Sequence, residues 1–215
     1  MTSPPLPASG RLDLPVAHGQ LEAILKESPA PFAAAVVCHP HPIHGGTMNN
    51  NVVYRVAKAL TDAGASALRF NFRGVGRSSG KYDDGVGEEE DARAALDFLA
   101  QRYPGVPLWM AGFSFGARVG LTVGAADQRV KKLLGVGLAL RMFDYGFLTA
   151  STKPKAIIQA SEDEFGGRDA IAAAVATMAE PKRLYVVDGA SHLFPGHLDA
   201  LETAAASAVA FLRES

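Results

Sequence analysis

Short runs of hydrophobic residues alternate along this chain with longer amphipathic stretches that are rich in alanine. Short apolar runs are typical of strands whose two faces are both covered, and the longer stretches predict helices. The predicted strands cover residues 33–38, 65–72, 107–112, 133–138, 155–160 and 183–187. The predicted helices cover residues 51–63, 88–102, 115–126, 169–179 and 197–213. This alternation predicts the α/β class, with a mostly parallel central sheet and helices on both of its faces.

The chain before residue 33 has a different pattern. Residues 11–15 and 20–26 are separated by a short turn around His18 and Gly19, so we expect an antiparallel pair at one sheet edge. Residues 1–10 are rich in proline and lack the apolar run of a signal peptide, so we expect a flexible tail there. Residues 11–215 are then expected to form a single domain.

The composition agrees with one domain and argues against several classes of partner. The 215 residues are 48% hydrophobic and 20% charged, which is enough for one sizeable core. With 21 basic and 22 acidic residues, the chain lacks the basic surface of a protein that binds nucleic acid or an acidic membrane. A single cysteine excludes an intramolecular disulfide and favours the cytoplasm. We expect a monomer or homodimer that acts on a small molecule.

A serine between two glycines is the strongest chemical signal in the sequence. Residues 112–116 read Gly-Phe-Ser-Phe-Gly and join a predicted strand to a predicted helix. This G-x-S-x-G pattern is typical of a nucleophile elbow, whose tight turn leaves no room for a side chain at either glycine. We therefore predict that Ser114 is a nucleophile at the carboxyl end of a strand, where open α/β sheets bind their ligands.

A serine nucleophile needs a base, and in this arrangement the acid and then the base follow the serine along the chain. The histidines after Ser114 are His192 and His197. His192 directly follows the last predicted strand, which favours it as the base. His197 is the alternative, and it is expected on the surface at the start of a helix.

The acid that orients the base is expected just after the strand 155–160, where three carboxylates occur together. Asp163 is the preferred candidate, because a short side chain at a strand end is held rigidly. Glu162 and Glu164 are expected to face solvent. Asp144 is the alternative acid, since it follows the preceding strand within reach of the loop that carries His192.

The negative oxygen that forms when a serine attacks a carbonyl needs two backbone N–H donors. One is expected from Phe115, which follows the nucleophile, and the other from the loop after the strand 33–38. In that loop Pro40 and Pro42 have no N–H group, which makes His41 the best placed donor.

The same loop contains His39, His41 and His44, but no acidic residue lies nearby in sequence to complete a tetrahedral metal site, and the adjacent Cys38 ends an apolar run. We therefore expect no metal, and we expect the buried Cys38 to be chemically inert. The glycine-rich loop 71–80 lacks the third glycine of a dinucleotide fingerprint, so no cofactor is expected there. Its Arg73 is expected to pair with a carboxylate or with loop carbonyls below the site.

The candidate substrate pocket is expected to be open. About 16 residues separate the strands 133–138 and 155–160, which is too few for an inserted lid domain. Aromatic and sulfur side chains from this connection and from the elbow are expected to line an apolar acyl site. These residues are Phe113, Met142, Phe143 and Tyr145.

Three motifs together resemble the α/β-hydrolase superfamily, over the chain from about residue 12 to the C-terminus. They are H-P-H-P-x-x-G-G-T-M-x-N at residues 39–50, F-N-F-R-G-V-G-x-S-x-G at 70–80, and G-F-S-F-G at 112–116. The combination is similar to a small, lidless bacterial subfamily that is related to dienelactone hydrolases and the catalytic domains of prolyl oligopeptidases. The resemblance implies a catalytic triad of Ser114, Asp163 and His192. The acid loop departs from the usual pattern, because Ala160 precedes it and Gly166 and Gly167 follow it.

The function expected from these residues is that of a carboxylesterase-like serine hydrolase, which cleaves small carboxylic esters through an acyl-enzyme intermediate. A thioesterase or a peptidase would use the same triad, so the sequence does not decide between esters, thioesters and amides as substrates. A binding module that keeps the fold without catalysis is the alternative from another functional class.

Overall fold

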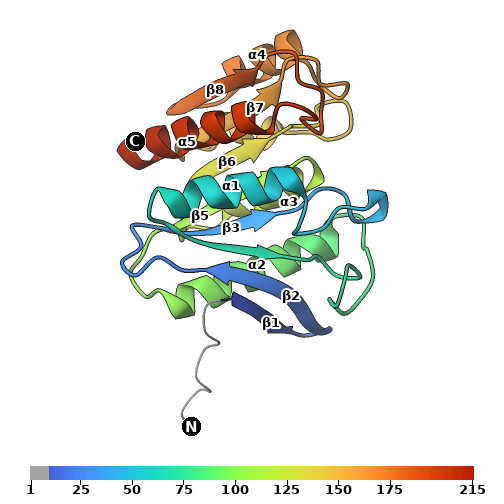
Figure 1. Cartoon of the computed structure of the whole chain (residues 1–215), viewed down its shortest axis with the longest axis vertical. Helices are drawn as coiled ribbons and strands as arrows, with labels where there is room; N and C mark the ends of the chain where they lie inside the picture. Colours follow the sequence, from blue (N-terminus) through green and yellow to red (C-terminus); the bar gives the residue numbers. More distant parts are fainter. Residues whose placement is uncertain (1–9) are drawn as a thin grey trace.

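The computed structural model describes residues 10–215, and the tail expected over residues 1–10 lies, apart from Gly10, outside the described residues. The described chain forms an eight-stranded sheet in the order β1-β2-β4-β3-β5-β6-β7-β8. β1 pairs antiparallel with β2, β2 pairs antiparallel with β4, and the other neighbours are parallel. Figure 1 shows the β1–β2 hairpin at one edge of the sheet and β8 at the other. The strands are β1 (Gly10–Val16), β2 (Gly19–Lys26), β3 (Ala34–Cys38), β4 (Ser66–Phe70), β5 (Leu108–Phe113), β6 (Val130–Val136), β7 (Lys155–Ala160) and β8 (Lys182–Val187).

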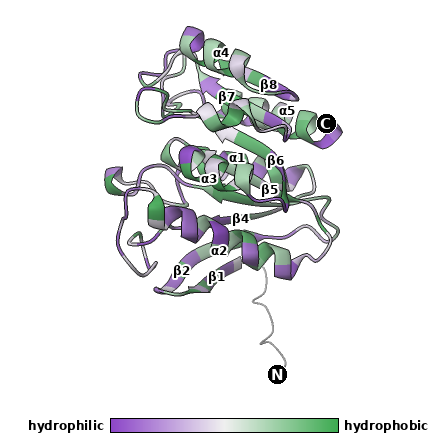
Figure 2. Ribbon diagram, turned by 180° about the vertical axis from the view of Figure 1, so that it is seen from behind, coloured by the Kyte–Doolittle hydropathy of each residue, from purple (hydrophilic) through white to green (hydrophobic). Residues whose placement is uncertain are grey.

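Helices cover both faces of this sheet. α1 and α5 pack on one face, and α2, α3 and α4 pack on the other, so each face has its own buried hydrophobic cluster. Figure 2 shows the hydrophobic colour concentrated in the central strands and the hydrophilic colour on α2 and the edge hairpin. The helices are α1 (Asn51–Asp62), α2 (Val86–Arg102), α3 (Phe115–Ala126), α4 (Arg168–Thr177) and α5 (Leu198–Glu214), with short 3-10 helices η1 (Pro42–His44) and η2 (Gly146–Thr149).

The α/β class and the two-sided helix cover are confirmed, and the differences from prediction lie at element ends. β6 covers Val130–Val136 instead of 133–138, because Lys131 and Lys132 interrupt the apolar run at its start. The strand then ends before Gly137, whose φ of 55° is a left-handed conformation that favours glycine. β4 ends at Phe70, where the glycine-rich loop begins earlier than the apolar run indicated.

The topology brings the loops that carry chemistry to one edge of the sheet. β5 lies between β3 and β6, so Ser114 follows a central strand. The loops after β3, β4, β6, β7 and β8 leave from the same carboxyl edge, because these strands are parallel to β5. Among residues 10–215 no helix is both long and apolar enough to cross a membrane.

Candidate active site

The turn at Ser114 has the geometry that its two glycines predict. Ser114 has a φ of 57°, a left-handed conformation that an L-residue rarely adopts, and α3 begins at the next residue. A Cβ atom on Gly112 would lie 2.2 Å from the carbonyl oxygen of Gly116. A Cβ atom on Gly116 would lie 2.3 Å from the carbonyl oxygen of His39. Both glycines are therefore required by close backbone approach, and the turn presents the serine side chain above the sheet.

Ser114, His192 and Asp163 form a hydrogen-bonded chain. Ser114 Oγ lies 2.9 Å from His192 Nε2, and His192 Nδ1 lies 2.7 Å from Asp163 Oδ2. His192 and Asp163 are each 5% exposed, so solvent screens this pair only weakly. The aromatic rings of Phe113 and Phe165 pack at 5.2 and 4.8 Å from the His192 ring. The arrangement can deprotonate a serine hydroxyl and stabilise the imidazolium that results.

Gln159 is a part of the site that the sequence analysis missed. Its Nε2 donates to Asp163 Oδ2 at 2.9 Å, while the N–H of Phe165 donates to Oδ1 at 2.9 Å. Both carboxylate oxygens are thereby oriented toward donors, and Oδ2 also faces His192. Gln159 is fully buried, and the available signal was a glutamine within the otherwise apolar pattern of β7.

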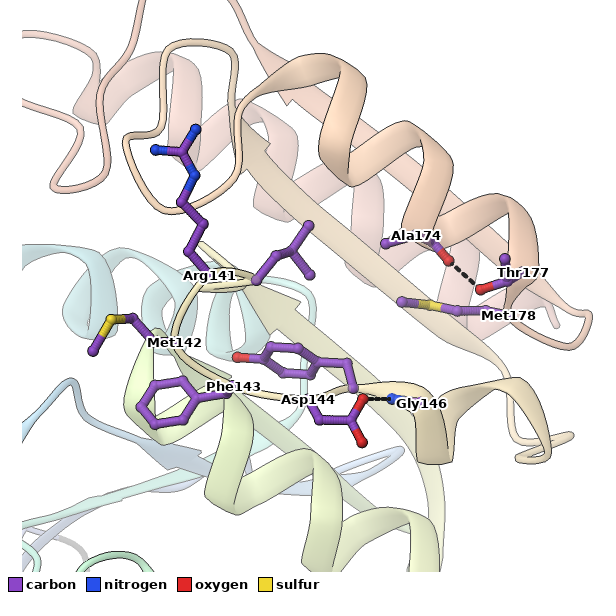
Figure 3. Close-up of a pocket in the computed structure, with 10 residues that line it drawn as sticks. Arg141, Met142, Phe143, Asp144, Gly146, Ala174, Thr177 and Met178 are labelled. Atoms are coloured by element: carbon purple, nitrogen blue, oxygen red, sulfur yellow. Dashed lines mark hydrogen bonds between the residues drawn. The ribbon is translucent and has the colours of Figure 1, made fainter.

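The alternative acid and the alternative base form hydrogen bonds with groups outside the chain of Ser114, His192 and Asp163. Asp144 is exposed and accepts a hydrogen bond from the N–H of Gly146 at 2.7 Å, as Figure 3 shows. His197 precedes α5, and its Nδ1 lies 2.9 Å from the carbonyl oxygen of Pro195. Glu162 is exposed as expected. Glu164 is exposed as well, but its Oε2 also accepts a hydrogen bond from the N–H of His192 at 3.2 Å.

A cavity of about 570 Å³ opens beside Ser114, within the size range of small-molecule sites. Met142 and Phe143 line it, as expected for an acyl site. The other lining residues come from the loops after β3, β6, β7 and β8, and they are Pro40, His41, His44, Gly45, Gly46, Asn50, Ala139, Glu164, Phe165, His192 and Leu193.

Phe113 and Tyr145 do not line this cavity, which corrects two of the expected substrate contacts. Phe113 is 1% exposed and packs behind His192, since it points to the sheet face that α1 and α5 cover. Tyr145 is 5% exposed and lines a neighbouring cavity of about 510 Å³, where burial raises the pKa of its hydroxyl. Met142 and Phe143 line both cavities, and Figure 3 shows them among the residues of the neighbouring one.

The two residues expected to donate N–H groups to an oxyanion lie beside Ser114. His41 lines the same cavity as Ser114, and its ring packs 4.7 Å from the ring of Phe115. The His41 carbonyl accepts hydrogen bonds from the N–H groups of His44 and Gly46, which form a tight turn around η1. The His41 side chain contacts the Tyr82 hydroxyl through Nε2 at 3.1 Å.

The comparisons with known proteins agree with this fold. A family model described as the alpha/beta hydrolase fold matches residues 43–162, which is more than half of the chain. The chain belongs to the α/β hydrolase family. A solved α/β serine hydrolase homologue from Coxiella burnetii is 39% identical, with a TM-score of 0.84 over 92% of this chain and 95% of that one.

Two other known proteins are similar to this α/β hydrolase over most of its length. A serine hydrolase without a lid from Xanthomonas campestris is 32% identical and covers 97% of each chain with a TM-score of 0.86. An uncharacterised protein of Rickettsia prowazekii is 36% identical over 187 residues, which are 82% of this chain and 79% of that protein. These similarities confirm the predicted resemblance to small lidless hydrolases, and they support a hydrolase function.

His39 links the loop of His41 to the loop after β4. Its Nδ1 donates to the carbonyl oxygen of Pro40 at 2.6 Å, and its Nε2 accepts from the N–H of Phe72 at 3.0 Å. The side chain is fully buried, and this burial lowers its pKa to about 4. His39 therefore acts as a neutral structural connector in this hydrolase. Among residues 10–215 no cluster of three or more His, Cys, Asp or Glu side chains is arranged to hold a metal ion.

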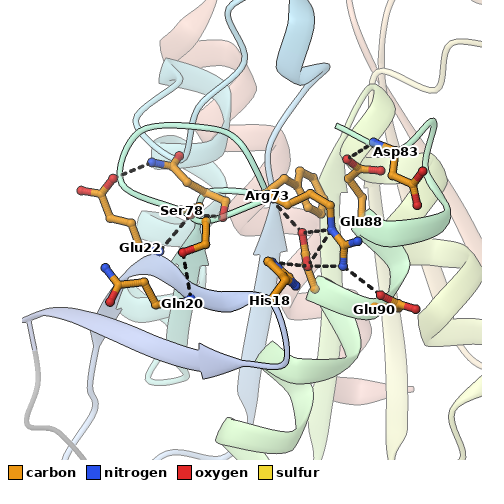
Figure 4. Close-up of polar contacts among 12 residues, drawn as sticks. His18, Gln20, Glu22, Arg73, Ser78, Asp83, Glu88 and Glu90 are labelled. Atoms are coloured by element: carbon orange, nitrogen blue, oxygen red, sulfur yellow. Dashed lines mark hydrogen bonds and ion pairs between the residues drawn. The ribbon is translucent and has the colours of Figure 1, made fainter. Parts of the chain in front are cut away.

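Buried carboxylates anchor the glycine-rich loop below the site (Figure 4). Asp91 accepts a hydrogen bond from the backbone N–H of Arg73 at 2.8 Å and pairs with its guanidinium at 2.8 Å. Glu22 accepts from Asn71 Nδ2 at 2.9 Å, and Asn71 Oδ1 accepts from the N–H of Met48 at 2.8 Å. The predicted pairing of Arg73 with a carboxylate is confirmed, and the network reaches the segment that follows His41.

Proposed function

We propose that this α/β hydrolase is a carboxylesterase-like serine hydrolase that cleaves small carboxylic esters through an acyl-enzyme intermediate. Ser114 is the nucleophile, His192 is the base and Asp163 is the acid that orients the base. The observation that carries the proposal is the contact of 2.9 Å between Ser114 Oγ and His192 Nε2, continued to Asp163 at 2.7 Å. The similarity to known serine hydrolases supports it.

In the proposed mechanism, Ser114 Oγ attacks the carbonyl carbon of the ester while His192 Nε2 takes the hydroxyl proton. Asp163 accepts the hydrogen bond from Nδ1–H and stabilises the imidazolium. The backbone N–H groups of Phe115 and His41 bind the oxyanion. His192 then gives its proton to the leaving alkoxide oxygen as the carbon–oxygen bond breaks. Water attacks the acyl-enzyme with His192 again as base, which releases the acid and restores the serine.

Small esters are proposed because of the shape and chemistry of the cavity. Its volume of about 570 Å³ suits a small molecule, and Met142, Phe143 and Leu193 supply apolar surface beside the nucleophile. The connection between β6 and β7 contains only η2, so no inserted domain covers the site. A substrate therefore reaches Ser114 directly from solvent.

The test is hydrolysis of p-nitrophenyl acetate and butyrate by the purified wild-type protein and by Ser114→Ala. We expect turnover by the wild type and a loss of at least about 10³-fold in kcat for the variant, because the triad acts as a unit. Matched acyl thioesters and anilides measured beside the esters identify the preferred leaving group. A folded wild-type protein that turns over none of these substrates would contradict the proposal and favour a binding module.

A further inference from the structure

Among the residues that line the cavity of Ser114, Glu164 is the only aspartate, glutamate, lysine or arginine. The other lining residues are apolar or glycine, or carry hydroxyl, amide or imidazole groups. Burial and the nearby His44 hold the pKa of His41 below its ordinary value, so its imidazole is uncharged at neutral pH. Apart from its histidines, the cavity wall therefore carries one acidic side chain and no lysine or arginine.

The Glu164 carboxylate is fixed in place by the loop that carries the base. Its Oε2 accepts the hydrogen bond from the N–H of His192 at 3.2 Å. Arg141 donates to the main-chain oxygen of Glu164 at 2.9 Å, but within residues 10–215 no basic side chain forms an ion pair with the carboxylate. Arg141 lines the neighbouring cavity instead, and Figure 3 shows its side chain extending away from Phe143. Within residues 10–215 the Glu164 carboxylate therefore accepts this one hydrogen bond and forms no ion pair, while the Arg141 guanidinium is bound to its main-chain oxygen.

The surroundings of Glu164 suit a cation better than an anion. Asp163 is the next nearest carboxylate in the chain, but its side chain is fully buried and paired with His192 and Gln159. Phe143 and Phe165 line the same cavity, and aromatic faces attract cations. A second carboxylate on a substrate would meet a like charge here and no lysine or arginine from the cavity wall.

We infer that Glu164 makes this site selective for the charge of the acyl group, so that esters with a cationic or uncharged acyl group bind and esters with a second carboxylate are rejected. The inference rests on the proposed esterase function. Two unit charges about 8 Å apart at an effective dielectric constant of about 40 change an equilibrium constant about fivefold. The effect acts in opposite directions on cationic and anionic esters, and added salt screens it because Glu164 is exposed.

The experiment uses three p-nitrophenyl esters of similar size: hexanoate, hydrogen adipate and 5-(trimethylammonio)pentanoate. They are measured with the wild type, with Glu164→Gln and with Glu162→Gln as the matched control. Glutamine at 164 removes the charge and keeps an oxygen to accept the His192 N–H. Glu162 is an exposed neighbour outside the cavity lining, so its substitution tests for a long-range effect of charge.

We expect Glu164→Gln to lower the cationic-to-anionic ratio of kcat/KM at least about tenfold, mainly through KM, since the charge acts on binding. Raising the salt concentration should lower the same ratio in the wild type and leave it unchanged in Glu164→Gln. Glu162→Gln should keep the wild-type ratio. If Glu164→Gln changes kcat for all three esters by one factor and preserves the ratio, Glu164 only positions the loop and the inference is overturned. If the wild type hydrolyses none of these three esters the inference is overturned, and if it also fails to hydrolyse p-nitrophenyl acetate and butyrate the proposed function is overturned as well.

Discussion

Acid should destabilise the protein in part through the buried side chain of His39. Its pKa is lowered by burial from 6.5 to about 4. Between these two pH values the His39 side chain is protonated in the unfolded chain but not in the folded chain. The free energy of unfolding therefore falls as the pH falls. The stabilisation is fully present above pH 6.5 and is lost as the pH falls to about 4. The difference in pKa corresponds to about 3 kcal/mol.

The structure shows what the proton would break. Nε2 of His39 accepts the N–H of Phe72 at 3.0 Å, and Nδ1 already donates to Pro40. A proton on Nε2 removes the acceptor and separates the loop of His41 from the loop after β4.

The assay is urea denaturation at a series of pH values from 4 to 8, with the wild type and His39→Gln. The quantity compared is the slope of the free energy of unfolding against pH. Glutamine changes the stability at neutral pH, but it does not titrate and so adds nothing to this slope. As the pH falls from 6.5 to about 4, we expect the free energy of unfolding to fall by about 3 kcal/mol less in His39→Gln than in the wild type. If the free energy of unfolding depends on pH in the same way in the wild type and in His39→Gln, His39 does not contribute to the acid sensitivity.

Three further predictions follow from the site and its support. Asp163→Asn should lower kcat for p-nitrophenyl butyrate about 10⁴-fold with little change in folding, while Asp144→Asn should keep wild-type kinetics. Gly116→Ala should lower the free energy of unfolding in urea by about 3 kcal/mol or more, because the new Cβ would lie 2.3 Å from a backbone oxygen; an unchanged value would contradict the elbow geometry. Arg73→Met should cost about 3–5 kcal/mol in the same assay, since it removes the guanidinium partner of the buried Asp91, and a loss below about 1 kcal/mol would show that the pair is dispensable.

The order and type of the elements could be predicted from the sequence because the buried strands are continuous apolar runs. The elbow could also be predicted, since two close backbone approaches require Gly112 and Gly116. Its short side chain favours Asp163 among several neighbouring carboxylates, and in the structure Asp163 contacts His192.

The details that the sequence could not provide depend on side-chain direction and on contacts across loops. Phe113 precedes the nucleophile, but the alternation of β5 turns its ring to the opposite layer from the cavity. Tyr145 lies in the right connection and faces the neighbouring cavity. Gln159 and Glu164 contact the acid and the base loop through hydrogen bonds that depend on how β7 and β8 are paired. No local pattern contains that information.

The most direct test of the account is intact-mass spectrometry after treatment with a fluorophosphonate, which reacts with an activated serine. The central claim is that His192 and Asp163 activate Ser114 through contacts of 2.9 and 2.7 Å. We expect one covalent adduct on the wild type and none on a folded Ser114→Ala variant. A folded wild type without an adduct, or an adduct that persists in Ser114→Ala, would contradict it.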